Sequence, residues 1–546
     1  MRAQINKIIK FFLACCLIIS CQVRKADWVV FNANVYTVNE TFEKATAFAI
    51  KDGKFISVGS DEIVNLYPNA LKFDAKGLPI YPGFIDAHCH FFNLGLSLGQ
   101  LDLRGSKSIA EIEKRLLSYS QKNESNVIIG RGWDQNLWNN KAFPKNDFLN
   151  KLFPDKLVLL RRVDGHALLV NDLVIKKAGI NSKTKVSGGS ILFENNKPTG
   201  ILIDRAMDIA MSILPPEDSK VTTKALIDAQ KKAFENGLTT VDDAGLNKKT
   251  IQVIDSLQEI GELKIRVYAM ISNTKDNLNY FLDKGIIEKE KLTVRSVKAY
   301  LDGALGSRGA LLKKPYSDDK KNKGITITTK EELFELADKL SSKGFQLNTH
   351  AIGDKANEIV LDVYNYILKE IEDPRWRVEH AQVVDEFDIQ KFNSKIIPSV
   401  QPTHATSDMN WADERLGDNR LKRAYAYKVL LDWSGKIALG TDFPVEKVNP
   451  LLTFYSAVAR KNIKGSPSKG FLKENALNRV EALKGMTIWA AYSNFEESLK
   501  GSIEIGKYAD FVMLTKDIMK IPEEEITSVD VVATIVDGFI VFQKFD

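Results

Sequence analysis

Four of the six histidines in this 546-residue chain stand at or beside the ends of short apolar runs. His88 and His90 are two residues apart, so on an extended chain both imidazoles point to the same side. His350 and His380 each close another run, and Asp442 closes a further one. Imidazole nitrogens and carboxylate oxygens are ligands that Zn²⁺ takes from proteins. The pattern therefore predicts a divalent-metal site.

The joint placement of these residues favours a metal over the simpler alternative. A lone His-x-His pair is a weak signal, and an isolated histidine is more often a hydrogen-bonded interior residue. Here, however, four of only six histidines end predicted strands, and an aspartate ends another. In a parallel barrel the carboxyl ends of the strands meet at one face, where their side chains converge.

Eight apolar runs are typical of buried parallel strands, and helical stretches such as 331–342 and 355–371 lie between several of them. This alternation predicts an α/β fold, specifically a (β/α)₈ TIM-type barrel. The expected strands are 84–88, 239–242, 265–270, 294–299, 345–350, 376–380, 396–400 and 436–442.

The ends of the chain differ from this middle part. Residues 26–79 and 491–546 contain short strand-like runs, with Asp-Gly turns at 52–53 and 537–538. We expect these two segments to form a small β-sandwich domain from both termini, with the barrel at 80–490. The first two barrel strands are separated by far more chain than an ordinary connection uses. An inserted subdomain is therefore expected at about 93–224.

Composition indicates a folded protein with no nucleic-acid partner. Hydrophobic residues make up 44% and charged residues 27%, which is a globular balance. The net charge of +6 is small and mixed along the chain, unlike a nucleic-acid-binding surface. Only one of four cysteines, Cys89, lies in the folded body, so no disulfide framework is expected there. On an extended strand Cys89 faces away from its histidine neighbours, and we expect it to pack in the core.

The first 21 residues are typical of an export signal. Positive residues precede an apolar run at 11–19 that is too short to span a bilayer. The ending Ile-Ile-Ser-Cys at 18–21 is similar to a bacterial lipobox, in which Cys21 is lipidated. We expect an exported protein, lipid-anchored to the bacterial cell envelope. An ordinary signal peptide that happens to contain cysteines is the alternative.

Several motifs together resemble the amidohydrolase superfamily. The first motif is Pro-Gly-Phe-Ile-Asp-Ala-His-Cys-His at 82–90. It is followed along the chain by Thr349-His350, Glu379-His380-Ala381 and Gly440-Thr441-Asp442. Further stretches resemble its amidohydrolase-3 branch, the YtcJ-like and N-substituted formamide deformylase group. They lie at 131–135 (Arg-Gly-Trp-Asp-Gln), 164–166 (Asp-Gly-His), 301–308 (Leu-Asp-Gly-Ala-Leu-Gly-Ser-Arg), 401–404 (Gln-Pro-Thr-His) and 501–510.

The resemblance implies a ligand set for one or two divalent ions per subunit, with Zn²⁺ as the expected metal. In many relatives the lysine of the fourth strand is carboxylated by carbon dioxide and bridges two metals. That position is Lys298 here, and an ordinary lysine paired with Asp302 or another acid is the alternative. The implied ligands are His88, His90, Lys298, His350, His380 and Asp442.

The implied reaction is hydrolysis of a carbon–nitrogen bond in a small molecule, of the non-peptide amide, formamide or carbamate type. A bound metal lowers the pKa of water from ~15.7 toward ~7. Asp442 is expected to be both ligand and catalytic residue, taking the proton of water and returning it to the leaving nitrogen. A heterocycle deaminase of the same fold and a catalytically silent binding lipoprotein are the alternatives.

The remaining candidates are expected to contact substrate. His166 and His404 could donate to the substrate carbonyl, with structural hydrogen bonding as the alternative. Trp133 and Asp134 could line the pocket mouth, or Trp133 could belong to a buried aromatic cluster with Trp138. Arg308 could bind an anionic group or cap a loop, and Asp302 belongs to the same stretch. Besides the small-molecule substrate and the membrane, a homodimer is left open.

Overall fold

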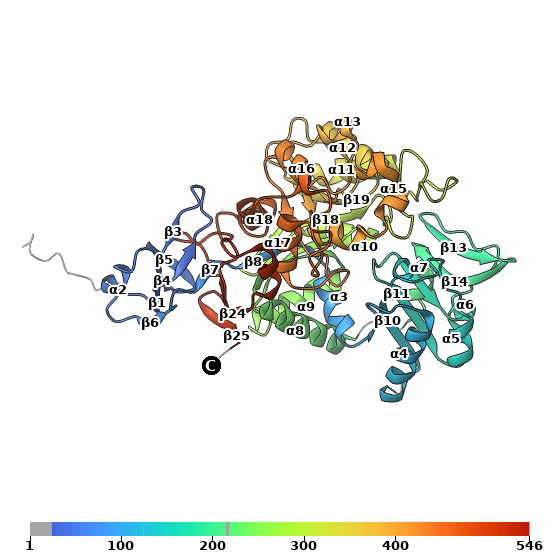
Figure 1. Ribbon diagram of the computed structural model, residues 1–546, viewed down its shortest axis with the longest axis horizontal. Helices are drawn as coiled ribbons and strands as arrows, with labels where there is room; N and C mark the ends of the chain where they lie inside the picture. The colour runs from blue at the N-terminus through green and yellow to red at the C-terminus, as the bar shows by residue number, and fades with distance from the viewer. Residues whose placement is uncertain (1–24, 124, 215–217, 545–546) are drawn as a thin grey trace, which may run out of the picture.

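Three parts of the chain can be followed in the computed structural model, which describes residues 25–123, 125–214 and 218–544 (Figure 1). A barrel occupies the middle of the molecule, and a small sheet domain lies at one end of it. An inserted subdomain, drawn in teal, lies at the other end. The barrel therefore separates the two smaller parts.

The barrel consists of eight parallel strands that pair in chain order, and a short antiparallel strand, β17 (Ile287–Glu288), is added to one of them. All eight overlap the predicted strands, so the predicted (β/α)₈ barrel is confirmed. Every residue of β19 is buried, because both faces of a parallel barrel strand are covered. The strands are β8 (Phe84–Cys89), β15 (Leu238–Leu246), β16 (Arg266–Ser272), β18 (Leu292–Tyr300), β19 (Gln346–Ala351), β20 (Trp376–His380), β21 (Ile396–Val400) and β22 (Ala438–Leu439).

The ring of strands closes between the last strand and the first. The backbone N–H of Asp442 donates to the carbonyl of His88 at 2.8 Å. A β-carbon at Gly440 would lie 2.5 Å from the backbone nitrogen of His88, so only glycine permits this approach. The eighth strand was predicted over 436–442, but β22 has two residues. The close approach to β8 and the left-handed φ of 61° at Asp442 end its regular pairing.

Helices surround the barrel strands (Figure 1). The helix α11 begins at a capping box formed by Thr329 and Glu332, and apolar side chains on its inner face are buried. These helices are α3 (Phe91–Leu98), α8 (Ser219–Glu235), α9 (Lys248–Glu259), α10 (Lys275–Lys284), α11 (Lys330–Ser341), α12 (Asp354–Ile367), α13 (Glu386–Ile389), α14 (Pro402–Asp408), α15 (Ala412–Leu421), α16 (Tyr427–Ser434), η2 (Lys473–Asn475), α17 (Pro450–Ala459), α18 (Arg479–Gly485) and α19 (Ile488–Ser493).

The small sheet domain joins strands from both ends of the chain into two sheets. One sheet has the order β5 (Lys54–Gly59), β4 (Ala47–Lys51), β1 (Trp28–Phe31), β6 (Leu71–Asp74). The second has the order β25 (Phe539–Gln543), β24 (Val531–Val536), β23 (Phe511–Leu514), β7 (Pro79–Pro82), β2 (Asn34–Tyr36), β3 (Lys44–Ala45). A shared core that includes Phe48, Phe55 and Phe511 packs residues of both sheets together. The helices α2 (Ile63–Leu66) and η3 (Glu523–Ser528) complete the terminal segments.

The inserted subdomain has a six-stranded sheet of its own between β8 and β15. Its order is β13 (Gly189–Glu194), β14 (Lys197–Asp204), β12 (Ala167–Val170), β11 (Leu157–Arg162), β10 (Val127–Trp133), β9 (Leu101–Asp102). The side chains of β11 alternate between two hydrophobic cores. Val158 and Leu160 belong to one core, and Leu157 and Leu159 belong to the other. Its helices are α4 (Ile109–Lys122), η1 (Gln135–Leu137), α5 (Asp147–Leu152), α6 (Asp172–Lys177) and α7 (Ala206–Met211).

The expected signal peptide at 1–21, with Cys21, lies outside the described residues. Within the described residues, no helix combines the length and the apolar character needed to cross a membrane. Export and lipidation therefore stay predictions.

Candidate active site

The predicted ligand residues gather at the carboxyl ends of the barrel strands. A cavity of about 1000 Å³ opens there between the barrel and the inserted subdomain. It is lined by five of the predicted ligands, which lie on five different strands or within three residues after them: His90, Lys298, His350, His380 and Asp442. The barrel therefore brings together residues that are more than 350 positions apart in the chain.

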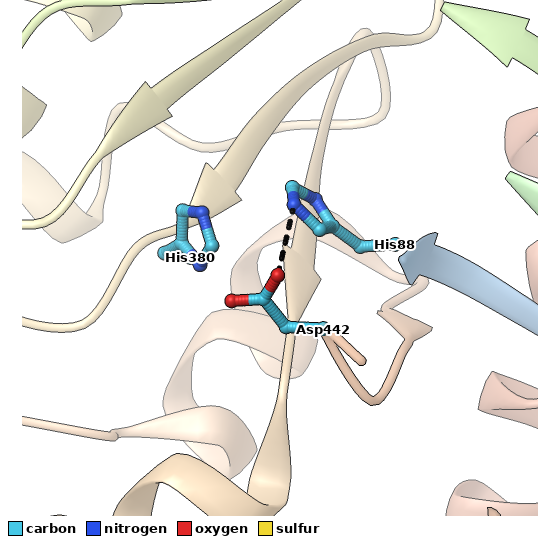
Figure 2. A group of neighbouring side chains, drawn as sticks. All are labelled: His88, His380 and Asp442. Carbon is cyan, nitrogen blue, oxygen red and sulfur yellow. Dashed lines mark ion pairs between the residues drawn. The ribbon is translucent and has the colours of Figure 1, made fainter. Parts of the chain in front are cut away.

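Three side chains form the tightest group. His88, His380 and Asp442 each offer a ligand atom, and these atoms all lie within 4.8 Å of one another (Figure 2). Nε2 of His88 lies 3.8 Å from Oδ1 of Asp442. The three residues are at most 5% exposed, so little water competes for their polar atoms. This arrangement can hold one divalent cation.

Two further histidines adjoin this group. Nε2 of His90 lies 3.2 Å from Oδ1 of Asp442. The rings of His350 and His380 are 4.5 Å apart between centroids. His90 and His350 thus each contact one member of the group that His88, His380 and Asp442 form.

The histidines are in the protonation state that a metal requires. Burial, together with the charge of Lys298, lowers the pKa of His88 to about 4. Burial also lowers the pKa of His90, His350 and His380, the last two well below the usual value. Near neutral pH these imidazoles are therefore uncharged and keep a lone pair for a cation.

One buried oxygen lacks a hydrogen-bond donor. Oδ1 of Asp442 is buried and accepts no hydrogen bond from the described residues. A buried carboxylate oxygen is normally satisfied, because leaving it unpaired is costly. Neutral imidazoles around an unsatisfied carboxylate oxygen are a donor set that suits Zn²⁺ or a similar cation. The residues present therefore fit the implied metal.

Lys298 lies beside the metal ligands without an acidic partner. Its Nζ is 3.3 Å from Nε2 of His88, and its side chain is 1% exposed. Among the described residues no carboxylate lies within ion-pair distance of this ammonium. Burial lowers the pKa of Lys298 to about 8. The alternative in which Lys298 pairs with Asp302 is not what the structure has.

Two residues that the sequence reasoning missed orient the ligands. Oε2 of Glu379 is 2.5 Å from Nδ1 of His88, and Oε1 of Gln401 is 2.7 Å from Nδ1 of His380. For His88 the contact occupies the ring nitrogen opposite the one that faces Asp442 and Lys298. Arg377 in turn donates to Oε1 of Glu379 at 2.7 Å. The available signal was a pair of charged residues, Arg377 and Glu379, alternating within the apolar strand β20.

The remaining two histidines reach the same cavity. Nε2 of His404 is 3.1 Å from Oδ2 of Asp442, and Nδ1 of His166 is 2.6 Å from Oδ1 of Asp204. Burial opposes protonation of both, but the neighbouring carboxylates raise the pKa of each histidine. Both rings line the cavity, as does the predicted Asp134. These residues can therefore contact a bound substrate.

Three predicted substrate contacts are corrected by the structure. Trp133 is fully buried in the core of the inserted subdomain, where its indole N–H donates to the carbonyl of Leu160 at 2.7 Å. Asp302 is also fully buried, and its carboxylate accepts backbone N–H groups, including that of Gly353 at 2.8 Å. Arg308 pairs with Asp318 at 2.9 Å. None of the three lines the cavity, because each side chain is engaged elsewhere.

Cys89 lies where the strand alternation predicts. It is fully buried within the main barrel core, and its sulfur is 3.4 Å from the carbonyl oxygen of Asp242. Burial raises the pKa of this thiol well above its usual value. A protonated, buried thiol packs in the core as a small apolar group.

A barrel with a histidine–aspartate cluster at the carboxyl ends of its strands is compatible with a metal-dependent hydrolase, because the active sites of barrel enzymes lie at this face. The model of the amidohydrolase family matches residues 72–542, and the chain belongs to this family, in its YtcJ-like amidohydrolase-3 branch. It is a hydrolase of the amidohydrolase superfamily.

Similar proteins come from plants, bacteria and archaea. The protein LONG AFTER FAR-RED 3 of Arabidopsis thaliana is 32% identical, over 94% of this chain and 91% of its own length. A putative amidohydrolase, YtcJ of Bacillus subtilis (strain 168), is 31% identical over 95% and 100%. N-substituted formamide deformylase of Arthrobacter pascens is 25% identical over 95% and 98%. An uncharacterized metal-dependent hydrolase from Pyrococcus horikoshii OT3 has a similar structure, with TM-score 0.74 and 30% identity over 91% and 99% of the two chains.

Proposed function

We propose that this hydrolase uses a divalent metal ion, Zn²⁺, to cleave a carbon–nitrogen bond in a small non-peptide amide, formamide or carbamate. The observation that carries the proposal is the cluster of His88, His380 and Asp442, of which His380 and Asp442 line a large cavity. The name of one relative, N-substituted formamide deformylase, supports the carbon–nitrogen bond as the target.

Asp442 is suited to handle the proton of the attacking water. When bound, the metal supplies Lewis acidity and lowers the pKa of water. Burial opposes ionisation, but the hydrogen bond from His404 and the nearby rings of His90 and His88 hold the pKa of Asp442 well below its usual value. Asp442 is therefore ionised, can accept the water proton and can return it to the leaving nitrogen.

His404 and His166 are the residues that we expect to donate hydrogen bonds to the substrate. His404 holds Oδ2 of Asp442, and this fixes the orientation of the carboxylate plane. Both histidines can donate an N–H to the substrate carbonyl oxygen, where negative charge grows in the transition state. His404 is buried, which excludes water from its hydrogen bond and strengthens it.

We also propose that Lys298 is carboxylated. A pKa of about 8 leaves a substantial neutral fraction of the amine near neutral pH, and only the neutral amine adds carbon dioxide. The addition forms an N–C bond, one C=O bond of carbon dioxide becomes a C–O⁻ single bond, and the amine loses one N–H proton to solvent. The product is an anion, which would balance the cationic charge of one or two metal ions beside His88.

Metal reconstitution tests the proposed activity. The purified protein is stripped with a chelator and reloaded with Zn²⁺, and hydrolysis of N-substituted formamides, amides and carbamates is measured. We expect turnover only in the reloaded protein, and a loss of roughly 10²- to 10⁴-fold in Asp442→Asn. The exposed Asp432 on α16 provides the control, Asp432→Asn. Release of ammonia from heterocyclic amines instead would indicate a deaminase, and metal binding without any hydrolysis would indicate a binding protein.

We propose that the protein is exported and anchored through Cys21. The proposal rests on the positive start, the apolar run and the Ser20-Cys21 junction. Radiolabelled palmitate should label the full-length protein in bacterial cells but not Cys21→Ser. Equal labelling of both would refute the anchor.

A further inference from the structure

Two arginines of the inserted subdomain stand side by side on the cavity wall. Arg131 on β10 and Arg161 on β11 are directly paired in the register of these parallel strands. Residues paired in this way project to the same face of a sheet. Both arginines line the cavity that contains the metal ligands. The two positively charged guanidinium groups therefore face the same cavity.

Neither arginine has a carboxylate partner. Among the described residues no acid lies within ion-pair distance of either guanidinium. Arg131 donates from Nη2 to the carbonyl of Val163 at 3.1 Å, and its buried Nε has no acceptor. Burial, with the nearby charge of Arg161, lowers the pKa of Arg131 to about 10. Both side chains are partly buried at the cavity wall, and charges withdrawn from water in this way are normally paired, so the two guanidinium groups are suited to bind an anion.

The next arginine along the chain shows the contrast. Arg162 projects to the opposite face of β11, where it is ion-paired with both Asp134 and Asp164. The same short segment thus contains one arginine that is fully neutralised by the protein and one that is not. The acid that acts on Arg161, Asp208, does so only at longer range. Arg162 and its two partners also border the cavity, so the cavity wall holds one neutralised arginine and two that no carboxylate contacts.

The arginine pair lies near the reaction centre. The hydroxyl-bearing ring of Tyr300 interacts electrostatically with Arg161 and lies 5.4 Å from the ring of His350. The ammonium of Lys298 is 4.7 Å from the centroid of the same ring. Tyr300 thus connects the arginines to the ligand cluster. A cavity of about 1000 Å³ has room for a small molecule that reaches both.

We propose that Arg131 and Arg161 bind a carboxylate of the substrate, so that the substrates are N-acyl or N-formyl amino acids and similar amides with a carboxylate near the cleaved bond. This inference rests on the proposed hydrolase function. Planar guanidinium groups bind carboxylates through paired, charge-assisted hydrogen bonds. A dianionic phosphate fits less well, because Asp164, Asp204 and Asp208 line the same cavity and would repel it.

A matched pair of substrates tests the inference directly. N-formylphenylalanine and N-formylphenethylamine differ only in the carboxylate, and kcat/KM is measured for both with the Zn²⁺-loaded protein. We expect the carboxylate-bearing compound to be preferred roughly 10- to 100-fold. Equal rates, or a preference for the neutral compound, would overturn the inference while leaving the hydrolase function intact.

Variants then assign the preference to the arginines. Arg131→Gln and Arg161→Gln should each lower kcat/KM for N-formylphenylalanine roughly tenfold or more, mainly through KM. Hydrolysis of N-formylphenethylamine should change little, which also shows that the variants fold. Arg423→Gln removes a partly exposed arginine outside the cavity and should change neither rate. A preference that survives both cavity variants would overturn the assignment.

Calorimetry separates this inference from the proposed function. If neither compound is hydrolysed, the proposed function fails for these substrates, and binding is measured by titrating each compound into the Zn²⁺-loaded protein. Tighter binding of N-formylphenylalanine that is lost in Arg161→Gln would support the arginine site. Binding of the two compounds with equal affinity, or of neither, would overturn it.

Discussion

The carboxylate of Glu379 lies 2.5 Å from Nδ1 of His88, and both side chains are fully buried. Burial opposes the charge, but Arg377 and His88 hold the pKa of Glu379 below its usual value. An ionised Glu379 only accepts hydrogen bonds, so Nδ1 of His88 carries the proton. The lone pair on Nε2 is then directed toward Asp442 and Lys298.

Replacing this carboxylate should weaken metal binding. Glu379→Gln keeps the size of the side chain but removes the charge that fixes the His88 ring, and we expect a loss of roughly 10- to 100-fold in metal affinity. Titration of the stripped protein with Zn²⁺ measures it. Glu358→Gln, on the surface helix α12, is the control. Unchanged affinity in Glu379→Gln would contradict the proposed role.

His404 should affect turnover and not metal content. It contacts Asp442 only through Oδ2, while the histidine ligands face Oδ1. We expect His404→Gln to reduce kcat by roughly 10²- to 10³-fold, the usual effect of losing a transition-state hydrogen bond. Metal analysis of the same sample should give the wild-type stoichiometry. A variant with normal kcat would exclude His404 from the reaction.

Lys298 offers a test of the carboxylated form. Lys298→Ala should lose activity and any second metal equivalent, because the bridging anion is absent. Adding acetate, whose carboxylate can occupy the vacated space, should restore part of the activity. Native mass measurement of the wild type should show the mass of one added carbon dioxide. A wild-type mass without this addition, at full activity, would refute the carboxylation.

Asp517 joins the two ends of the chain in a way that depends on pH. Its carboxylate accepts hydrogen bonds from Tyr36 at 2.8 Å, Tyr81 at 3.0 Å and Asn34 at 2.9 Å. Burial opposes ionisation, but these bonds, the Tyr36 one foremost, lower the pKa of Asp517. Its contribution is therefore present above the unfolded carboxyl pKa of ~4 and lost as the pH falls through the lower folded value.

Asp517→Asn should destabilise the protein by about 1–3 kcal/mol near neutral pH. The difference from wild type should shrink at acid pH, because protonation removes the same charge in the wild type. Melting temperatures at a neutral and an acid pH measure this. Asp283→Asn, at an exposed position of α10, should show no such pH-dependent difference. A gap that stays constant with pH would contradict the assignment to the Asp517 charge.

The barrel strands could be predicted from local sequence patterns. Features that depend on contacts between distant parts of the chain could not. The strands were predictable because parallel strands buried on both faces are continuous apolar runs, as at 267–271 in β16. The short β22 was not, because its end is set by the approach of Gly440 to His88, far away in the chain. For the same reason Trp133 could not be distinguished from a cavity residue, since its burial depends on the packing of the inserted sheet.

Among the site residues, the ligands could be predicted from the sequence, but the residues that orient them could not. His88, His380 and Asp442 were predictable because strand ends converge in a barrel. The roles of Glu379 and Gln401 depend on which ring nitrogen they contact, and no spacing in the sequence encodes that. The side-by-side placement of Arg131 and Arg161 depends on the register of two strands in the insertion.

The central claim is that His88, His380 and Asp442 bind a metal ion. A crystal of the Zn²⁺-loaded protein, measured on both sides of the zinc absorption edge, tests it most directly. We predict an anomalous peak within about 2.0–2.2 Å of a ligand atom of each of the three residues. A map with zinc bound elsewhere, or with no zinc between these side chains, would contradict it.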